Sequence, residues 1–386
     1  MRRTTFFASL AIGVAVCAST AQAQGFLGGQ SGLDPKFCET GALRQTVVYV
    51  DDMFMQDGQL EWANKLFDKL KATLTPSERV TVVELSPADG QSREVWTGCW
   101  PDYPQEERDR LGKSYSFFSK NPLKVLEDQQ GFFASGFAGA LSTIFDKHHQ
   151  PKTIIDPSST PSKAIIGALS SDGARYAQTT VTIRAIIYSD LAENSELASV
   201  FRPQPQPAVN FGKQLGTYLR SSVFYAFGVG VGGDVGGGQE VREATRALWT
   251  TALGSMSATV AGLGPDLTVP NALPVTAREF TIDLKENNQP LSGRLSLLAD
   301  ADGDLVDSWV GIVRLSSAAL TGTMHCEAGG SGICTINAAT SHGILSDSAS
   351  EVLTLRGDQS KPLTGLIGVK GSNVMFPLTA TLNATH

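Results

Sequence analysis

Hydrophobic and polar positions divide the chain into a first part that mixes strand and helix periods and a last part with strand periods alone. In the first part, the apolar run Thr46–Val50 precedes helical spacing over Leu60–Leu74, and a second apolar run follows at Arg79–Leu85. Short apolar runs beside helical periods are typical of an α/β sheet layer. The pattern therefore predicts that the folded region opens with a βα unit.

The same alternation continues as far as Val260, with Asn121-Pro122 dividing the helical stretch between Glu106 and His149. Glu94–Trp100 predicts an edge strand that carries a cysteine. We assign residues 40–263 to one α/β domain on this basis. Its other expected elements are strands at Thr180–Tyr188 and Val223–Val229 and helices at Ala164–Leu169, Phe211–Leu219 and Glu240–Val260.

Helical periods end before Gly262–Pro274, a stretch rich in Gly, Pro and Asn. Residues 264–274 are therefore predicted to be a linker, and residues 275–386 a second domain. Short strands separated by Gly, Ser, Asn and Asp clusters predict a β-sandwich or barrel there. Seven strands are expected, at Glu279–Leu284, Gly293–Leu298, Trp309–Leu315, Ile333–Ala338, Glu351–Leu355, Thr364–Val369 and Val374–Leu382.

The first 23 residues have the three parts of a cleavable export signal. Arg2 and Arg3 supply the charge, Phe6–Val16 is apolar but too short to span a bilayer, and Ala21-Gln22-Ala23 fits an A-x-A cleavage site. We therefore expect a periplasmic or secreted protein, cleaved after Ala23. A lipidated Cys17 is the alternative, although lipoprotein signals usually have Gly, Ala or Ser where Val16 stands.

Charge and hydropathy exclude some partners of the mature chain. Its 29 basic residues face 38 acidic ones, which gives a formal charge of −9. This balance argues against nucleic acid and anionic lipid as partners. No further apolar run is long enough for a membrane span, and nothing in the sequence indicates an oligomeric state.

Four cysteines remain after cleavage, an even number in a chain bound for an oxidising compartment. Two disulfides are expected, and three pairings are possible. The simplest joins Cys326 to Cys334 across a Gly-rich stretch and Cys38 to Cys99.

The order of elements resembles a von Willebrand factor type A domain over roughly Thr46–Leu263. The order is strand, helix, strand, edge hairpin, helices, a strand ending in Ser-Asp, a strand ending in Gly-x-Gly, and a closing helix with a Trp. The resemblance implies a Rossmann-like, doubly wound sheet and a divalent ion held by D-x-S-x-S, a later Thr and an Asp.

Here the first motif reads Asp51-Asp52-Met53-Phe54-Met55, so methionines replace both serines. Thr160 and Asp190 match the later Thr and Asp, and Asp52 offers an extra oxygen. Magnesium or calcium is the ion that the resemblance implies, but a thioether is a poor ligand for either. The alternative is a retained scaffold without a metal, whose strand ends still form a binding surface.

A second cluster of carboxylates predicts a calcium loop in the second domain. It consists of Asp300, Asp302, Asp304 and Asp307, closely spaced around Gly303. The spacing is not that of an EF-hand. A solvated acidic hairpin turn is the alternative.

Catalytic motifs are scarce. Only five histidines occur, none in H-E-x-x-H, and no G-x-S-x-G is present. We therefore expect a non-enzymatic binding or adhesion-type protein that engages a protein partner through the α/β domain. The alternative is an extracytoplasmic hydrolase that uses an unrecognised pair of carboxylates.

Overall fold

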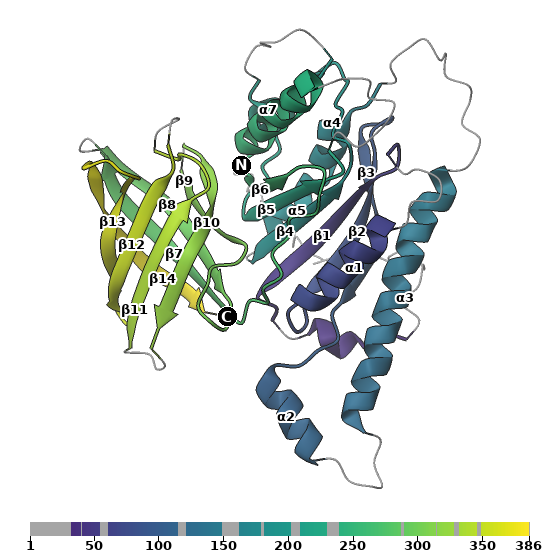
Figure 1. Cartoon of the computed structure of the whole chain (residues 1–386), viewed down its shortest axis with the longest axis horizontal. Coiled ribbons are helices and arrows are strands. Elements are labelled where there is room, and N and C mark those ends of the chain that lie inside the picture. Colours follow the sequence, from purple (N-terminus) through teal and green to yellow (C-terminus); the bar gives the residue numbers. More distant parts are fainter. Residues whose placement is uncertain are drawn as a thin grey trace, which may run out of the picture.

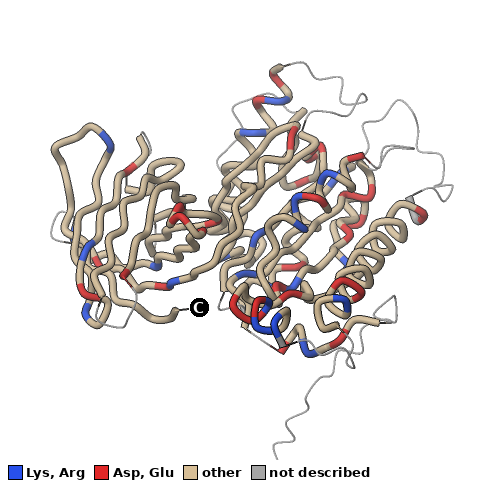
Figure 2. The backbone as a smooth tube through the Cα atoms, turned by 60° about the horizontal axis from the view of Figure 1, so that its bottom comes forward, with Lys and Arg blue, Asp and Glu red and all other residues tan. Residues whose placement is uncertain are grey.

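The computed structural model describes residues 32–39, 41–54, 61–114, 121–148, 162–178, 181–201, 209–229, 239–286, 289–313, 315–327, 332–345 and 349–385. They form an α/β domain and, beside it, an eight-stranded antiparallel barrel (Figure 1). Figure 2 shows that charged positions are much denser in the α/β domain than in the barrel. Among the described residues, no helix has the length and apolar character needed to cross a membrane.

The α/β domain is built on a six-stranded sheet of order β3-β2-β1-β4-β5-β6. All neighbouring strands are parallel except the edge strand β3, which runs antiparallel to β2. The strands are β1 (Arg44–Asp51), β2 (Arg79–Ser86), β3 (Gln91–Cys99), β4 (Thr182–Tyr188), β5 (Ser222–Phe227) and β6 (Thr259–Leu263).

Helices cover both faces of this sheet, which explains why its central strands read as continuous apolar runs. Along β1, Val48 and Val50 pack toward α1 and α3, whereas Val47 and Tyr49 pack toward α4 and α7. The helices are α1 (Glu61–Thr73), α2 (Gln105–Ser114), α3 (Pro122–His148), α4 (Ile165–Ser171), α5 (Gly173–Gln178), α6 (Phe211–Leu215) and α7 (Gln239–Ser255).

The second domain is a closed barrel of order β10-β11-β12-β13-β14-β7-β8-β9, so the barrel alternative of the sequence analysis is confirmed. Its interior is filled by apolar side chains such as Phe280, Ile336 and Leu353. The strands are β7 (Thr276–Glu286), β8 (Gln289–Ala299), β9 (Ser308–Ile312), β10 (Ser317–Cys326), β11 (Ile333–Thr340), β12 (Glu351–Asp358), β13 (Leu363–Val369) and β14 (Met375–Thr385).

Two strands were missing from the prediction. The last helix ends at Ser255 rather than Val260, and β6 follows after Ser257, whose φ is +63°. β10 has small residues and a glycine where a strand pattern expects larger apolar ones. Gly322 is needed there because a Cβ would lie 2.1 Å from the carbonyl oxygen of Asn337 on β11.

The two expected disulfides are present in the simplest pairing. Cys38–Cys99 ties the short helix η1 (Pro35–Cys38) to β3, with Cα atoms 5.3 Å apart. Cys326–Cys334 joins directly opposed residues of β10 and β11. The first therefore fixes the amino-terminal segment to the sheet edge, and the second closes a barrel hairpin.

Candidate functional site

The carboxyl ends of β1 and β4 bring together Asp51 and Asp190, two of the ligands that the resemblance implies. Asp51 is the last residue of β1, and Asp190 follows β4 after Ser189. These strands are parallel neighbours, so their ends share one edge of the sheet. Both side chains are buried, with Asp51 fully covered.

A lysine that the sequence analysis did not single out lies between these two carboxylates. The Lys163 Nζ is 2.7 Å from Asp51 Oδ2 and 2.6 Å from Asp190 Oδ1, and its side chain is only 7% exposed. Lys163 stands two residues before α4, where its backbone exchanges hydrogen bonds with Asn194 of 2.9 and 2.8 Å. The loop after β4 therefore holds this lysine at the strand ends.

The two carboxylates also accept hydrogen bonds from groups other than the lysine. The Ser189 hydroxyl donates to Asp51 Oδ2 at 2.6 Å, and the Met53 N–H donates to Asp51 Oδ1 at 3.0 Å. The Ala192 N–H donates to Asp190 Oδ1 at 2.9 Å. Their orientation therefore depends on local backbone as well as on the lysine.

Asp52 lies on the β2 side of the same edge, where it accepts a hydrogen bond of 2.8 Å from the Ser86 hydroxyl. Thr160, the other expected ligand, lies outside the described residues. The described residues therefore do not show the four expected ligands, Asp51, Asp52, Thr160 and Asp190, around one position.

The charge state of this cluster follows from burial and proximity. Burial lowers the pKa of Lys163, but the charges of Asp51 and Asp190 outweigh it and raise the pKa above its usual range. The ammonium is therefore held charged. A hard divalent cation needs open carboxylate oxygens, and with Lys163 in this place the residues do not fit one.

Within the described residues, no group of three or more His, Cys, Asp or Glu side chains is arranged to hold a metal ion. Because Thr160 lies outside those residues, magnesium or calcium at the strand ends stays a prediction.

Glu193, on the loop after Asp190, is a further buried carboxyl group. Its Oε2 accepts a hydrogen bond of 2.9 Å from the Ile166 N–H in α4, and its Oε1 one of 2.5 Å from the Ser195 hydroxyl. Burial raises the pKa of Glu193 to about 7, although these hydrogen bonds and Lys163 favour the charged form. Glu193 therefore titrates near neutral pH beneath the carboxyl edge.

An aromatic pocket of about 450 Å³ opens at the same edge, next to the Asp51–Lys163–Asp190 cluster. One of its lining residues is Tyr188, the last residue of β4. The Tyr188 ring stacks on that of Trp62 of α1, with ring centroids 3.8 Å apart, and lies 5.0 Å, centroid to centroid, from the ring of Phe227 of β5. Phe54 also packs on Tyr188, and the absence of a Cβ at Gly228 makes room for its ring.

Charged side chains line the rim of this aromatic pocket. Glu61 and Lys65 of α1 form an exposed ion pair, with Lys65 Nζ 2.8 Å from Glu61 Oε1, and Asp266 also lines the pocket. Burial, followed by the charge of Asp51, raises the pKa of Tyr188 to about 12, so its hydroxyl stays protonated. The pocket thus combines an apolar floor with a hydroxyl and charged groups, as ligand pockets commonly do.

The predicted calcium loop is only partly assembled. Asp300, Asp302 and Asp304 share the turn after β8, where Asp300 Oδ1 accepts the N–H groups of Asp302 and Asp304 at 3.0 and 2.9 Å. Asp307 is buried elsewhere, between the two domains. The four carboxylates therefore do not converge in the described structure, and calcium binding at the exposed turn stays a prediction.

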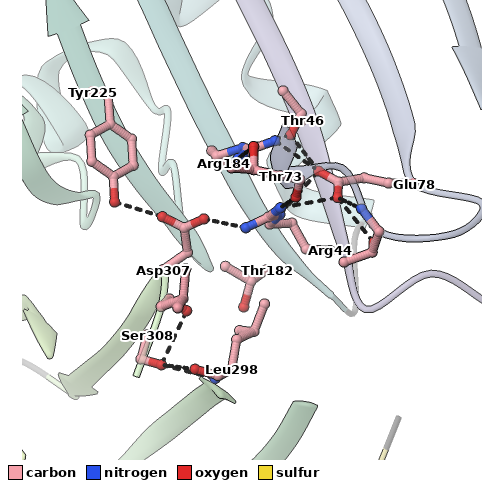
Figure 3. Close-up of polar contacts among 12 residues, drawn as sticks. Arg44, Thr46, Thr73, Glu78, Thr182, Arg184, Tyr225, Leu298, Asp307 and Ser308 are labelled. Atoms are coloured by element: carbon pink, nitrogen blue, oxygen red, sulfur yellow. Dashed lines mark hydrogen bonds and ion pairs between the residues drawn. The ribbon is translucent and has the colours of Figure 1, made fainter. Parts of the chain in front are cut away.

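Asp307 instead completes a buried ionic network at the amino ends of β1 and β4 (Figure 3). Arg44 makes an ion pair with Asp307 and another of 3.0 Å with Glu78, and Arg184 lies 3.3 Å from Glu78. The Tyr225 hydroxyl donates to Asp307 Oδ1 at 2.6 Å. We call these residues, Arg44, Glu78, Arg184, Tyr225 and Asp307, the interdomain network.

The network compensates the cost of burying its charges. Burial would raise the pKa of Glu78, but the charges of Arg44 and Arg184 outweigh it and lower the pKa. Beside the network, the Thr182 hydroxyl lies 2.7 Å from that of Ser296 on β8, and Trp309 of β9 joins the core of the α/β domain. The barrel is therefore anchored to the amino edge of the sheet, opposite the aromatic pocket.

Comparison with known proteins leaves the family open. No family model and no curated protein matches the chain. One similar solved structure is the ArnB paralog VWA2 from Sulfolobus acidocaldarius, with 10% sequence identity and a TM-score of 0.35. Another is the human COPII-coat protein Sec24c, with 9% sequence identity and a TM-score of 0.32. They cover 89% and 88% of this chain, which spans only 66% and 44% of theirs. At these values the likeness assigns no function.

Proposed function

We propose that the protein is an exported, non-enzymatic binding protein whose α/β domain engages a protein partner at the carboxyl edge of its sheet. The aromatic pocket carries this proposal, because it lies where ligands bind open α/β sheets and is lined by Trp62 and Tyr188. Tryptophan and tyrosine are enriched among the residues that dominate binding energies at protein interfaces.

A place outside the cytoplasm, periplasmic or secreted, belongs to the same proposal. The two disulfides support it, because disulfides persist in oxidising compartments. A distant relationship to von Willebrand factor type A domains is proposed on the parallel sheet with its antiparallel edge strand β3 and on the acidic strand ends at Asp51 and Asp190.

The hydrolase alternative would use two carboxyl groups with oppositely shifted pKa values in an open cleft. At the carboxyl edge, Asp51 and Asp190 are instead joined by the ammonium of Lys163, and the raised pKa belongs to Glu193 beneath α4. These positions favour the binding function.

Capture of partners by the mature protein from its native envelope fraction tests the proposal. Trp62→Ala should weaken capture about tenfold or more, the order expected for an aromatic residue at the centre of an interface. Tyr218→Ala is the matched control, because this exposed tyrosine lies at the amino end of β5 on the opposite edge.

Melting temperatures of both variants would show whether each is folded. Equal capture by Trp62→Ala, Tyr218→Ala and the wild type would exclude the aromatic pocket as the binding surface. If the wild type captured no protein, the proposed function itself would be wrong.

A further inference from the structure

The strand ends that resemble a metal site have an ammonium between their carboxylates. We propose that Lys163 supplies the positive charge that a divalent ion would supply, and that removing this ammonium turns Asp51 and Asp190 into a divalent-cation site. The inference goes beyond the proposed function, because it concerns what holds the carboxyl edge together and can be tested without a partner.

Geometry is the first support. The ammonium nitrogen of Lys163 lies within 2.7 Å of one oxygen of each carboxylate, so it bridges them as a bound cation would. The ring of Phe54, with its centroid 5.9 Å from the nitrogen, covers it on another side. The two backbone hydrogen bonds to Asn194 fix the chain that carries the lysine.

The carboxylates are also held by groups other than the lysine. Asp51 accepts from the Ser189 hydroxyl and the Met53 N–H, and Asp190 accepts from the Ala192 N–H. These three hydrogen bonds do not involve Lys163. The two carboxylates therefore keep their orientation toward each other when the ammonium is removed.

Electrostatics then favours a cation. Asp51 is fully buried and Asp190 is nearly so, and without Lys163 their charges would repel each other in a poorly solvated place. A divalent ion with water in its remaining positions would restore neutrality, and carboxylate oxygens are its preferred ligands. In the wild type the same reasoning makes a second cation at this position unfavourable.

Calorimetric titration with MgCl₂ and with CaCl₂ tests the inference on the wild type, Lys163→Ala and Lys163→Ala/Asp190→Ala. The single variant should gain one binding site relative to the wild type, and the double variant should lose it. Lys124→Ala is the control, since it removes a lysine from an exposed pair with Glu127 and should gain no site.

Melting temperatures give a second readout. Lys163→Ala should melt several degrees below the wild type, and millimolar Mg²⁺ or Ca²⁺ should restore part of this loss in the single variant but not in the double one. EDTA should not reproduce this loss in the wild type. If Lys163→Ala does not fold, Lys163→Met keeps most of the apolar stem of the side chain but removes the ammonium, and its refolding yield should rise with added cation.

Two results would overturn the inference. One is a wild-type protein that binds a divalent ion at a site lost in Asp190→Ala, which would mean that Lys163 does not take the place of the ion. The other is equal stoichiometry for the wild type and a folded Lys163 variant. Loss of partner capture in Trp62→Ala would occur with either result, so failure of this inference is distinguishable from failure of the proposed function.

Discussion

The two ends of β1 and β4 carry buried charges for different purposes. At the amino ends, Arg44 and Arg184 are joined to Glu78 and Asp307 in a network that no solvent reaches and that includes a residue of the barrel. At the carboxyl ends, Lys163 joins two aspartates beside an open aromatic pocket. The same strands therefore anchor a second domain at one edge and carry the proposed binding surface at the other.

The difference lies in the balance of charge. The interdomain network has two guanidinium groups against two carboxylates, and each guanidinium also donates to neutral oxygens such as those of Thr73. The carboxyl edge has one ammonium, that of Lys163, and three aspartates, Asp51, Asp52 and Asp190. The pKa of the nearby Glu193 is about 7. The balanced cluster at the amino ends favours one fixed arrangement, whereas at the carboxyl edge the place between Asp51 and Asp190 is occupied by the ammonium of Lys163.

The largest expected effect comes from removing the charge of Glu78. Glu78→Gln keeps the size of the side chain but leaves Arg44 and Arg184 buried with Asp307 as their one remaining carboxylate in the network. We expect a loss of about 4 kcal/mol in the free energy of unfolding, the order found when one partner of a buried ion pair is removed. Urea denaturation measures it.

Glu94→Gln is the control for Glu78→Gln. Glu94 pairs with Arg175 at 3.0 Å but is 46% exposed, and exposed ion pairs contribute about 1 kcal/mol or less. If the two variants were equally stable, the interdomain network would not be what stabilises the amino edge.

Asp307→Asn should have the second largest effect, because it weakens the link between the domains. The amide still accepts a hydrogen bond from Tyr225 but no longer neutralises Arg44, so about 3 kcal/mol should be lost. Asn also tolerates the φ of +49° at this position. Calorimetry should show one transition for the wild type and two for Asp307→Asn, because the barrel and the α/β domain then unfold separately.

Asp302→Asn, in the exposed turn of the same barrel, is the control and should leave a single transition. A single transition for Asp307→Asn at the wild-type temperature would show that apolar packing around Trp309 couples the domains without the ion pair.

The sequence predicted the sheet well because its signals are local. Apolar runs and helical periods gave the bounds of β1, β2 and β4 to within two residues. Asp51 and Asp190 could be placed together because each lies at the carboxyl end of a parallel strand, and such strands end at one edge. β6 and β10 were missed because a short strand after a helix and a strand of small residues lack the apolar pattern.

The residues that the sequence did not predict depend on contacts between distant segments. Lys163 reaches Asp51 only because the loop after β4 turns back to pair with it, and a lone lysine before a short helix gives no sign of this. Asp307 was grouped with Asp300 by spacing, yet its backbone turns toward Arg44, 263 positions away. Buried arginines within strands look in sequence like ordinary exposed ones.

The smallest expected effect is a pH dependence of the free energy of unfolding, which arises from Glu193 at the carboxyl edge. Glu193 has a folded pKa of about 7, raised by burial from its ordinary 4.5, so the folded protein holds this proton more tightly than the unfolded chain. The resulting stability is fully present below about pH 4.5 and is lost as pH rises through about 7. We expect a loss of at most about 3 kcal/mol over this window.

Glu193→Gln should remove that loss, because the amide does not titrate and can keep a hydrogen bond with Ser195 while accepting one from Ile166. Glu196→Gln, on the same loop but exposed, should behave as the wild type. Urea denaturation of all three proteins between pH 4.5 and 8 gives the comparison. If the free energy of unfolding of Glu193→Gln changed with pH as that of the wild type does, burial beneath α4 would not be what raises the pKa of the Glu193 carboxyl group.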